Sequence, residues 1–450
     1  MIIERWRASG REVAVVGLAR SGVAAARLLR REGVPVYASD TAGGAEVEAR
    51  TAGLREAGIE VQPGGHDLGR IARAAAVVVS PGVPPSAPPL AAARGAGVEI
   101  LSEIDVGYDR LRQSRFAAIT GTNGKTTTTA LTAHLLQAAG LRAIAAGNIG
   151  LPLAEVALLP DAPAWIALEI SSFQLHDTWH LTPQVGMLTN LAPDHLDRYA
   201  TLEEYYADKA RLFLNAGPES VWVVNRDDAA VLAMSEGRAG RRLQFSVQGY
   251  GDAWYDPLTR RLMLGGAILL PREELPLLGD HNVANALAAA LVAQTAGAPA
   301  ETIATGLRSF RALAHRLEPV REVDGVLWIN DSKATNIAST AVALDALERP
   351  YVLLLGGRHK GEPYTALADL MRGRCRGVVA FGESGPLIVN DLKGRVPVVE
   401  GGSFEDVLGK ARALAHPGDA VLLSPACSSY DMFRNYEDRG ARFRAAVEAM

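Results

Sequence analysis

Short apolar runs that end in polar or glycine-rich sequence recur along this chain of 450 residues. Near the N-terminus, VAVVG leads through a glycine turn into an Ala- and Leu-rich stretch that reaches about Arg31. VPVYASD then ends at Asp40, and AAAVVVS ends at Ser80 and continues into PGVPPSAPP, whose proline cluster we expect to exclude regular structure. Strands of the buried type that alternate with helical stretches are typical of an open α/β sheet.

The same alternation continues twice more. The middle of the chain has the strand-bearing segments AAIT, AWIALEISSFQL, VGMLTNLAPDHLDRY and VWVVN, then short strands around 245–270 and the helical GDHNVANALAAALVA. The last third has VLWINDSKATN, YVLLLGGRHKGEPY, GVVAFGES and AVLLSPACSSYDMF. With residues 98–109 read as a linker, we predict three α/β domains: Rossmann-like over 1–104, P-loop ATPase-like over 105–311, and Rossmann-like over 312–450.

Composition places the chain among ordinary globular proteins. It is 48% hydrophobic and 21% charged with a net charge of -4, so nucleic acid is not an obvious partner, and no run is apolar enough for a membrane span. The N-terminal MIIERWRASGREV lacks the apolar core and cleavage site of a secretory signal. Only Cys375 and Cys427 occur, which argues against a disulfide framework or a cysteine metal site. We therefore expect a cytoplasmic protein.

The segment 117–129, AAITGTNGKTTTT, predicts a strand, a phosphate-binding loop and a helix. Gly121 and Gly124 would let backbone N–H groups surround phosphate oxygens at a helix start, where the helix dipole favours negative charge. Lys125 would reach the β and γ phosphates, and Thr126 would meet a phosphate-bound Mg²⁺. Ile119 replaces the first glycine of the generic G-x-x-x-x-G-K-[ST] pattern, so this is a variant loop for ATP or GTP. The alternative is a plain glycine turn with a solvated lysine.

Two further strand ends carry candidate metal ligands. Glu169 ends one apolar strand, and Asp194 with His195 follows another. In phosphate-loop proteins a carboxylate at a neighbouring strand end completes the Mg²⁺ shell directly or through water. Taken singly, Glu169 is explained as an edge residue and His195 as a turn histidine, whereas together they indicate a metal site.

Lys209 lies on the apolar face of a predicted helix over 202–214. At 100° per residue it shares one stripe with Leu202, Tyr205, Tyr206, Leu212 and Phe213. A lysine in that position is costly to desolvate unless it is paired or chemically modified. The alternative is that its stem packs while its ammonium reaches solvent.

Other polar groups leave two readings open. Gly17, Gly22 and Asp40 are spaced as in a dinucleotide fold, but Ala19 replaces the glycine that admits a pyrophosphate, so the pattern favours a nucleotide-like ligand over NAD, or tight turns alone. Asn282 and Asn285 share a face at a helix start and either read a base or cap the helix. In the last third, a group of polar and charged residues follows the apolar strands and either binds small anions or is ordinary surface charge: Asp331, Lys333, Thr335, Arg358, Lys360 and Ser429.

Four segments in combination, TGTNGKTT, LEISSFQL, NLAPDHLDRY and NDSKATN, resemble the ATP-dependent Mur ligases of peptidoglycan synthesis. The resemblance covers all three predicted domains. NDSKATN and LSPACSSYDMF resemble the member that adds D-glutamate to UDP-N-acetylmuramoyl-L-alanine rather than the later ligases. The resemblance implies an acyl phosphate made with ATP and Mg²⁺, a substrate-binding first domain, an ATP-binding central domain and a D-glutamate-binding third domain. We expect a catalytic cleft where the three meet, and a monomer.

The resemblance also implies residue roles. Lys125, Glu169, His195 and Lys209 would be catalytic, with Lys209 carbamylated, and Thr126, Glu169, His195 and Lys209 would serve the metal ions. ATP would contact Gly121, Thr122, Asn123, Gly124, Lys125, Thr126, Thr127, Asn282, Asn285, Arg316 and Asp331. The UDP substrate would contact Leu18, Ala19, Arg20, Asp40, Thr41, Ser80, Gly82 and Asn148. D-Glutamate would contact Lys333, Thr335, Lys360, Ser429 and Tyr436.

Three alternatives remain at this point. A ligase of the folylpolyglutamate synthase type shares the loop and the modified lysine, but the first domain and SPACSSYD speak against it. An NAD-dependent oxidoreductase would explain residues 13–40 but leaves GTNGKT without a purpose. A non-catalytic nucleotide switch would not need Glu169, His195 and Lys209 together.

Overall fold

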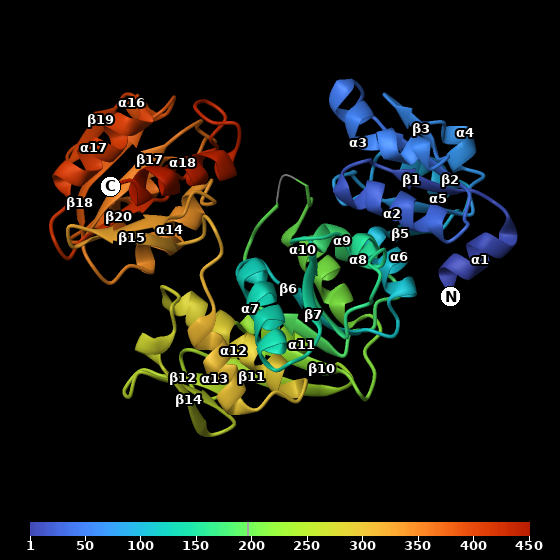
Figure 1. Cartoon of the computed structure of the whole chain (residues 1–450), viewed down its shortest axis with the longest axis horizontal. Helices are drawn as coiled ribbons and strands as arrows, with labels where there is room; N and C mark the ends of the chain where they lie inside the picture. The colour runs from blue at the N-terminus through green and yellow to red at the C-terminus, as the bar shows by residue number, and fades with distance from the viewer. Residues whose placement is uncertain (196–197) are drawn as a thin grey trace. The chain divides into compact units, whose positions relative to one another are not determined.

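The computed structural model describes residues 1–195 and 198–450, and their strands form three sheets (Figure 1). The chain divides into two compact units, one made of Met1–Leu275 and Val283–Ser309 and the other of Pro276–Asn282 and Phe310–Met450. The three predicted α/β domains are present as three sheets, whereas their exact boundaries stay predictions. Within the described residues, no helix has the length and apolar character that crossing a bilayer requires.

The first sheet is wholly parallel and has the order β3-β2-β1-β4-β5. Residues of β1 alternate between two apolar clusters, so both faces of the sheet are covered, as parallel sheets require. The elements are α1 (Ile2–Ser9), β1 (Val13–Val16), α2 (Arg20–Arg31), β2 (Val36–Asp40), α3 (Ala45–Glu56), β3 (Glu60–Pro63), α4 (Leu68–Ile71), β4 (Ala76–Val79), α5 (Pro88–Gly95) and β5 (Ile100–Ser102).

Two details of this domain differ from the sequence prediction. Strand β3 was not anticipated, because its residues are only half-buried and lack a long apolar run. Helix α5 begins inside the proline cluster that we expected to exclude regular structure. The reason is that Pro88 occupies the first helical turn, where a missing N–H costs nothing.

The central sheet has nine strands in the order β14-β13-β12-β11-β10-β9-β6-β8-β7 and is parallel from β7 to β12. Part of AWIALEISSFQL forms helix α9 instead of continuing the strand, because Ser171 and Gln174 make a capping box. The elements up to the sheet centre are α6 (Glu103–Arg110), β6 (Arg115–Thr120), α7 (Lys125–Ala138), β7 (Ala143–Gly147), α8 (Leu153–Val156), β8 (Trp165–Glu169), α9 (Ser172–His176) and β9 (Val185–Leu188). The others are α10 (Leu202–Ala210), β10 (Val221–Asn225), α11 (Ala229–Ser235), β11 (Arg241–Ser246), β12 (Ala253–Asp256), β13 (Arg261–Leu264), β14 (Ala267–Pro271), α12 (Asp280–Thr295) and α13 (Ala300–Ser309), with 3-10 turns at Arg211–Phe213 and Arg272–Glu274.

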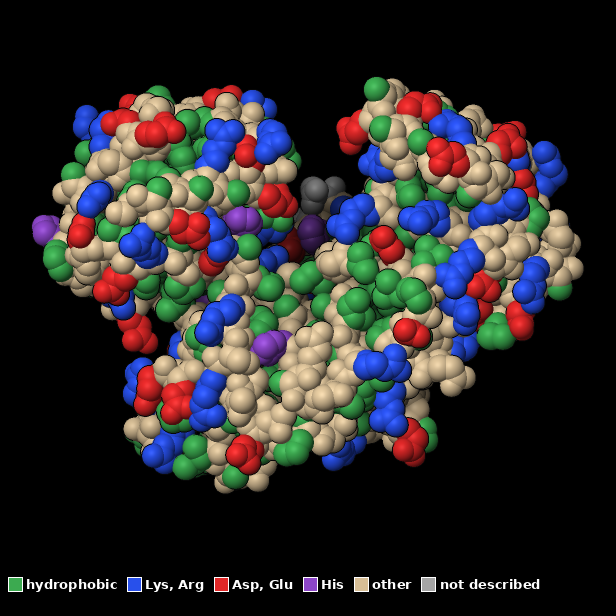
Figure 2. Space-filling model, viewed as in Figure 1, with side chains coloured by type: hydrophobic (Ala, Val, Ile, Leu, Met, Phe, Trp, Pro, Cys, Tyr) green, Lys and Arg blue, Asp and Glu red, His purple; other side chains and the backbone are tan. Residues whose placement is uncertain are grey.

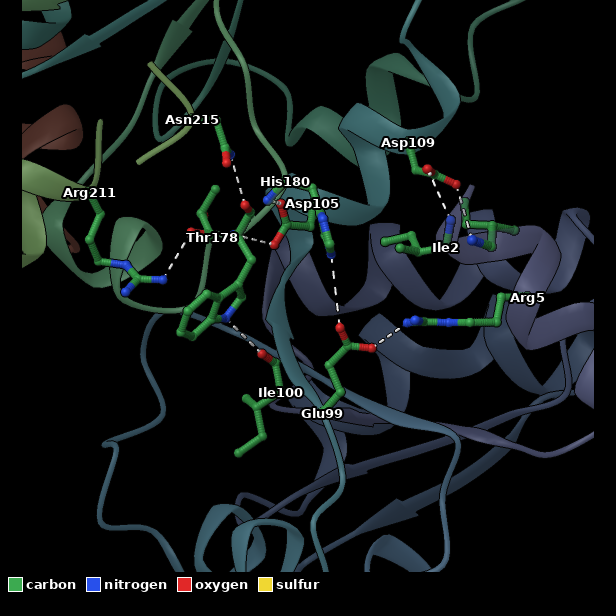
Figure 3. A network of polar contacts seen from close by, with 12 residues as sticks. Ile2, Arg5, Glu99, Ile100, Asp105, Asp109, Thr178, His180, Arg211 and Asn215 are labelled. Carbon is green, nitrogen blue, oxygen red and sulfur yellow. Dashed lines mark hydrogen bonds and ion pairs between the residues drawn. The ribbon is translucent and has the colours of Figure 1, made fainter. Parts of the chain in front are cut away.

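Residues 98–109, predicted as a linker, form β5 and α6 and fasten the first sheet to the second (Figure 3). Three buried carboxylates of α6 each accept hydrogen bonds from backbone N–H groups of another segment. Glu103 accepts from Ala154, Asp105 from Trp179 and His180 at 2.8 Å each, and Asp109 from Ile2 and Ile3 at 3.2 and 3.1 Å. Burial raises the pKa of Glu103 to about 7.

The third sheet has the order β15-β16-β20-β17-β18-β19, with β15 antiparallel at one edge and the remaining strands parallel. The carboxyl ends of its parallel strands meet at one edge, where ligands bind in open α/β sheets. The elements are β15 (Glu318–Val323), β16 (Val326–Asn330), α14 (Ile337–Asp345), β17 (Tyr351–Gly356), α15 (Ala368–Met371), β18 (Cys375–Phe381), α16 (Gly385–Leu392), β19 (Val398–Gly401), α17 (Phe404–Leu414), β20 (Ala420–Leu423) and α18 (Tyr436–Glu448), with a 3-10 turn at Tyr364–Leu367.

Charged side chains of both signs are interspersed on the face seen in Figure 2. This distribution agrees with a net charge of only -4 and with surface ion pairs such as Arg5–Glu99 and Arg412–Asp324.

Candidate active site

The predicted phosphate loop connects β6, in the middle of the central sheet, to α7. Gly121 and Gly124 have φ angles of 143° and 80°, which side chains rarely adopt. A Cβ at Gly121 would lie 2.0 Å from Oγ1 of Thr189, and one at Gly124 would lie 2.4 Å from Oδ1 of Asn285. Both glycines are therefore required by conformation and by space.

The end of β9 holds the loop in this shape. The N–H of Thr122 donates to the Asn190 carbonyl at 2.9 Å, and the N–H of Asn123 donates to Oδ1 of Asn190 at 2.8 Å. Thr189 Oγ1 in turn donates to the Asn123 carbonyl at 2.6 Å. Because these two loop N–H groups are engaged inside the protein, a phosphate would be bound chiefly by the first turn of α7, which contains Lys125, Thr126 and Thr127.

Two lysines converge on this loop. Lys125 Nζ donates to the carbonyls of Gly121 and Thr122 at 3.0 and 2.7 Å, and Lys209 Nζ donates to the same Gly121 carbonyl at 2.6 Å. Lys209 is 1% exposed, and its Nζ lies 4.6 Å from the centre of the Tyr205 ring. The burial predicted from the helix stripe is confirmed, and an ammonium that reaches solvent is excluded.

The surroundings of Lys209 favour its neutral form. Burial, and secondarily the positive charge of Lys125, lower the pKa of Lys209 to about 7, although Asp194 and Asp208 act in the opposite direction. A neutral amine is a nucleophile, whereas an ammonium is not. Lys209 is thus a buried amine with a lowered pKa and not a member of a surface ion pair, and the carbamate implied by the resemblance stays a prediction.

Glu169 ends β8 directly beside the loop, opposite Ile119 of β6. It is 2% exposed, and its Oε1 accepts from Nδ2 of Asn148 at 2.8 Å. Its Oε2 is buried and has no hydrogen-bond partner among the described residues. An unpartnered buried carboxylate oxygen beside a phosphate loop fits a cation, because Mg²⁺ prefers oxygen ligands and usually reaches proteins through one or two carboxylates.

His195 follows the end of β9 in the left-handed region, with φ of 55°. Its Nε2 lies 3.5 Å from Oδ2 of Asp194, and its ring lies 4.7 Å from the ring of Phe173. A strained, non-glycine residue at a strand end is a frequent feature of functional sites. Leu196 and Asp197 of the NLAPDHLDRY segment lie outside the described residues.

The described side chains do not assemble a complete metal site. Across residues 1–195 and 198–450, no three His, Cys, Asp or Glu side chains form a group that could hold an ion. The metal ligands implied by the resemblance also include Thr126 and a modified Lys209, and neither of these is a His, Cys, Asp or Glu side chain. Glu169 remains a candidate ligand because of its orphaned oxygen. It ends β8 and His195 follows β9, the two strands that flank β6 on either side.

In the first domain, three of the predicted substrate contacts lie together at the carboxyl ends of β1, β2 and β4. Asp40 Oδ2 accepts from the N–H of Leu18 at 2.6 Å, and Ser80 Oγ donates to the Gly17 carbonyl at 2.9 Å. Gly17 has φ of 87°, and a Cβ there would lie 2.8 Å from Ser80. This is the edge at which open α/β sheets bind nucleotides. The remaining predicted contacts, Ala19, Arg20, Thr41 and Gly82, are exposed around it.

The two asparagines of α12 have partners within the protein. Nδ2 of Asn282 donates to the Leu278 carbonyl at 2.8 Å, and Oδ1 of Asn285 accepts from Thr128 of α7 at 3.0 Å. Asn285 also lies against Gly124 of the phosphate loop. Its position beside the loop suits a nucleotide contact, and its bond to α7 gives it a structural role as well.

In the third domain, Asp331 is buried and engaged. Its Oδ1 accepts from the N–H of Leu317 at 3.1 Å and its Oδ2 from Oγ of Ser424 at 2.8 Å. Burial raises the pKa of Asp331 to about 7. Both carboxylate oxygens of Asp331 thus have partners within the third domain, Leu317 and Ser424. The ribose contact that the resemblance implies for Asp331 stays a prediction.

The predicted D-glutamate contacts lie in loops that follow the strands of the third sheet, except for Tyr436, which begins α18. Lys333 Nζ lies 3.9 Å from the centre of the Tyr436 ring. Lys360 is exposed and lines a shallow surface depression with Asn336 and His359. Thr335 is half-buried and Ser429 is buried.

Arg439 is a residue of this region that the sequence reasoning missed. It is 0% exposed and donates to Oγ and the carbonyl of Ser332 at 2.9 and 2.8 Å and to the Cys427 carbonyl at 3.2 Å. It thereby joins the two loops that carry Lys333 and Ser429. Burial lowers the pKa of Arg439 to about 10. The signal was present, because Arg439 shares the buried stripe of α18 with Phe443 and Val447, as Lys209 does on α10.

Comparisons with known proteins agree with this architecture. Three family models match the chain: "Mur ligase MurD-like, N-terminal domain" over residues 11–102, "Mur ligase middle domain" over 119–293 and "Mur ligase, glutamate ligase domain" over 315–427. The chain is 40% identical over 448 residues to UDP-N-acetylmuramoylalanine--D-glutamate ligase of Acidobacterium capsulatum, covering 98% of this chain and 96% of the relative.

Two solved structures share the fold. UDP-N-acetylmuramate-alanine ligase MurC from Thermotoga maritima is similar with a TM-score of 0.61 at 20% identity, covering 98% of this chain and 99% of that chain. MurF ligase from Thermotoga maritima in complex with ADP is similar with a TM-score of 0.58 at 18% identity, covering 84% of this chain and 90% of that chain.

Proposed function

This chain belongs to the Mur ligase family, and from that premise we propose that it joins D-glutamate to UDP-N-acetylmuramoyl-L-alanine at the expense of ATP. The observation that carries the proposal is the full-length similarity to a ligase of that name, in a chain whose phosphate loop, buried lysine and orphaned carboxylate lie together. The family identity rules out an NAD-dependent oxidoreductase. The match of residues 11–102 to a MurD-like N-terminal domain disfavours a ligase of the folylpolyglutamate synthase type.

The reaction has two steps. An oxygen of the alanine carboxylate attacks the γ-phosphorus of ATP, the bond from that phosphorus to the β–γ bridging oxygen breaks, and ADP leaves. The amino nitrogen of D-glutamate then attacks the acyl carbon, loses a proton, and expels phosphate from a tetrahedral intermediate as the C–O bond breaks. Charge accumulates on phosphoryl and acyl oxygens in both steps, so electrostatic stabilisation and positioning dominate the rate.

The residues of the central domain are suited to this chemistry. The first turn of α7 would bind phosphate oxygens, and Lys125, which now donates to two loop carbonyls, would turn to the γ-phosphate. Mg²⁺ would be held by Thr126, Glu169, His195 and a carbamate on Lys209, and would neutralise developing phosphate charge. Asn282, Asn285, Arg316 and Asp331 would complete the ATP contacts.

The other two domains would supply the acceptor and the amino acid. The strand ends around Leu18, Asp40 and Ser80 form the proposed site for the UDP substrate, with Asn148 near its muramoyl part. Lys333, Thr335, Lys360, Ser429 and Tyr436 would hold D-glutamate, and Lys333 and Lys360 provide cations for its carboxylates. Since all these groups belong to one chain, we propose a monomer that works in the cytoplasm, where ATP and nucleotide-linked sugars are made.

A coupled phosphate assay tests the proposal. ATP, Mg²⁺ and UDP-N-acetylmuramoyl-L-alanine are supplied with D-glutamate, L-glutamate or L-lysine in turn, and the product is identified by its mass. We expect phosphate and the amide product with D-glutamate only. Equal or faster turnover with L-glutamate or L-lysine would refute the assignment.

A further inference from the structure

A contact between the first and central domains involves Arg198, a residue to which the proposed mechanism gives no role. Its Nη1 donates to the Pro81 carbonyl at 2.7 Å and its Nη2 to the Val83 carbonyl at 3.1 Å. These two carbonyls flank Gly82, in the loop that leaves β4 after Ser80. One guanidinium from the central domain therefore holds both sides of a loop assigned to the UDP substrate.

Arg198 is also connected to His195, through its backbone and through its guanidinium. The N–H groups of Arg198 and Tyr199 donate to the His195 carbonyl at 2.9 and 3.1 Å. The guanidinium also lies 3.9 Å from the centre of the Phe173 ring, which in turn lies 4.7 Å from the imidazole of His195. A displacement of Arg198 would therefore be transmitted to His195 through these backbone hydrogen bonds and through the shared Phe173 ring.

We propose that Arg198 is a positioning residue that couples the UDP-substrate loop at residues 80–83 to the orientation of His195 in the ATP and metal site. A ligand that favours the loop conformation in which both carbonyls face Arg198 also favours this position of His195. By thermodynamic reciprocity, each ligand then raises the affinity for the other by the same factor. The inference rests on the proposed function, because that function assigns a ligand to each side.

Arg211 is a matched control within the same domain. It lies 4.1 Å from the centre of the Trp179 ring and donates to the Leu175 carbonyl at 2.7 Å. It also donates to the Thr178 carbonyl at 3.1 Å (Figure 3). It thus makes contacts of the same kind, to one ring and two carbonyls, outside the two proposed ligand loops. Arg198→Met and Arg211→Met lose comparable packing and hydrogen bonds, so they separate coupling from general stability.

The experiment uses the full chain and measures the dissociation constant of UDP-N-acetylmuramoyl-L-alanine with and without Mg²⁺ and a non-hydrolysable ATP analogue. The coupling factor is the ratio of the dissociation constant without Mg²⁺ and the ATP analogue to the one measured with them. It should be about five or more in the parent and in Arg211→Met, and about one in Arg198→Met. Arg198→Lys should be intermediate, because an ammonium keeps the charge but cannot hold both carbonyls and stack on the ring. If Arg198→Met does not fold, a coupling factor for Arg198→Lys that is smaller than that of the parent provides the test.

A second readout is a double-mutant cycle on kcat with His195→Ala. If Arg198 acts through His195, the loss of kcat caused by Arg198→Met should largely disappear in the His195→Ala background. An unchanged coupling factor in Arg198→Met, an equal loss in Arg211→Met, or no coupling in the parent would each overturn the inference. Failure of the parent to bind the UDP substrate at all would instead refute the proposed function.

Discussion

Replacement of Lys209 by alanine tests the most unusual side chain of the site. The Lys209 amine is 1% exposed, and its pKa is lowered to about 7 by burial and by Lys125. At pH 7.5 such an amine is about three-quarters neutral, whereas one with the ordinary pKa of about 10.4 is roughly one-thousandth neutral. Because CO₂ reacts only with the neutral amine, the fold raises the reactive fraction by several hundredfold.

If Lys209 functions as a carbamate, the site needs an anion at that point. Lys209→Ala should then lower kcat by about a hundredfold or more, as for the removal of a charge that stabilises phosphoryl transfer. Acetate, which can enter the vacated space and supply a carboxylate, should restore part of the activity. Lys125→Ala is the matched control, because its missing group is a cation and acetate should not rescue it.

The pH dependence gives an independent check. As pH rises through about 7 the amine loses its proton, so CO₂ uptake by unmodified protein, followed by intact mass, should rise with an apparent pKa near 7. Full activity of Lys209→Ala, or of protein shown by mass to lack the added CO₂, would refute this reasoning. A lack of acetate rescue combined with uptake that follows a pKa near 10 would contradict the effect of burial and of Lys125 on the amine.

Three other substitutions test the site and the fold. Lys125→Ala should abolish turnover without changing the circular dichroism, because it removes a charge beside the phosphates; activity within about tenfold of the parent would show that the loop is not catalytic. Gly124→Ala should lower the free energy of unfolding in urea by about 2 kcal/mol or more, since its φ of 80° disfavours a side chain and the Cβ would meet Asn285. Gly140 is the control, because it has a similar φ of 76° but open space around it. Gly140→Ala should therefore lose only the free energy that comes from the unfavourable φ. The pKa of Glu103 is raised to about 7 in the folded protein, so Glu103 binds a proton more tightly in the folded than in the unfolded state. Its contribution to the free energy of unfolding is therefore fully present below its ordinary pKa and is lost as the pH rises toward 7. Glu103→Gln should therefore lessen the parent's fall in stability between pH 5 and pH 8 by up to about 3 kcal/mol, and parallel stability profiles would contradict this.

Much of the fold follows from local rules. The strands that lead into Gly17, Gly121 and Glu169 are uninterrupted apolar runs, because parallel strands are buried on both faces. β3 and α5 were missed or misjudged because a half-buried strand has little hydrophobic signal and because Pro88 is tolerated in a first helical turn. Periodicity could not show that the supposed linker would become α6, since its anchors Ala154, Trp179 and Ile2 are remote in sequence.

The candidate site was predictable where a residue breaks a pattern. Lys209 was found because a lysine on an apolar stripe is anomalous, and its burial is confirmed. Arg439 fits the same rule but was overlooked in a helix that contains several arginines. Arg198 has no such signal, because the carbonyls that it contacts, those of Pro81 and Val83, lie more than a hundred positions away in the chain. Contacts of that kind become visible only in the folded molecule.

Isotope transfer from the acceptor carboxylate shows whether the amide is formed through an acyl phosphate. UDP-N-acetylmuramoyl-L-alanine labelled with ¹⁸O in the alanine carboxylate is incubated with the enzyme, ATP, Mg²⁺ and D-glutamate, and the released phosphate is analysed by mass spectrometry. Because the acyl phosphate breaks at its C–O bond, we predict that each phosphate carries one ¹⁸O from the carboxylate and that its amount equals that of the amide product. Phosphate without the label, formed alongside the amide, would contradict an acyl-phosphate ligase.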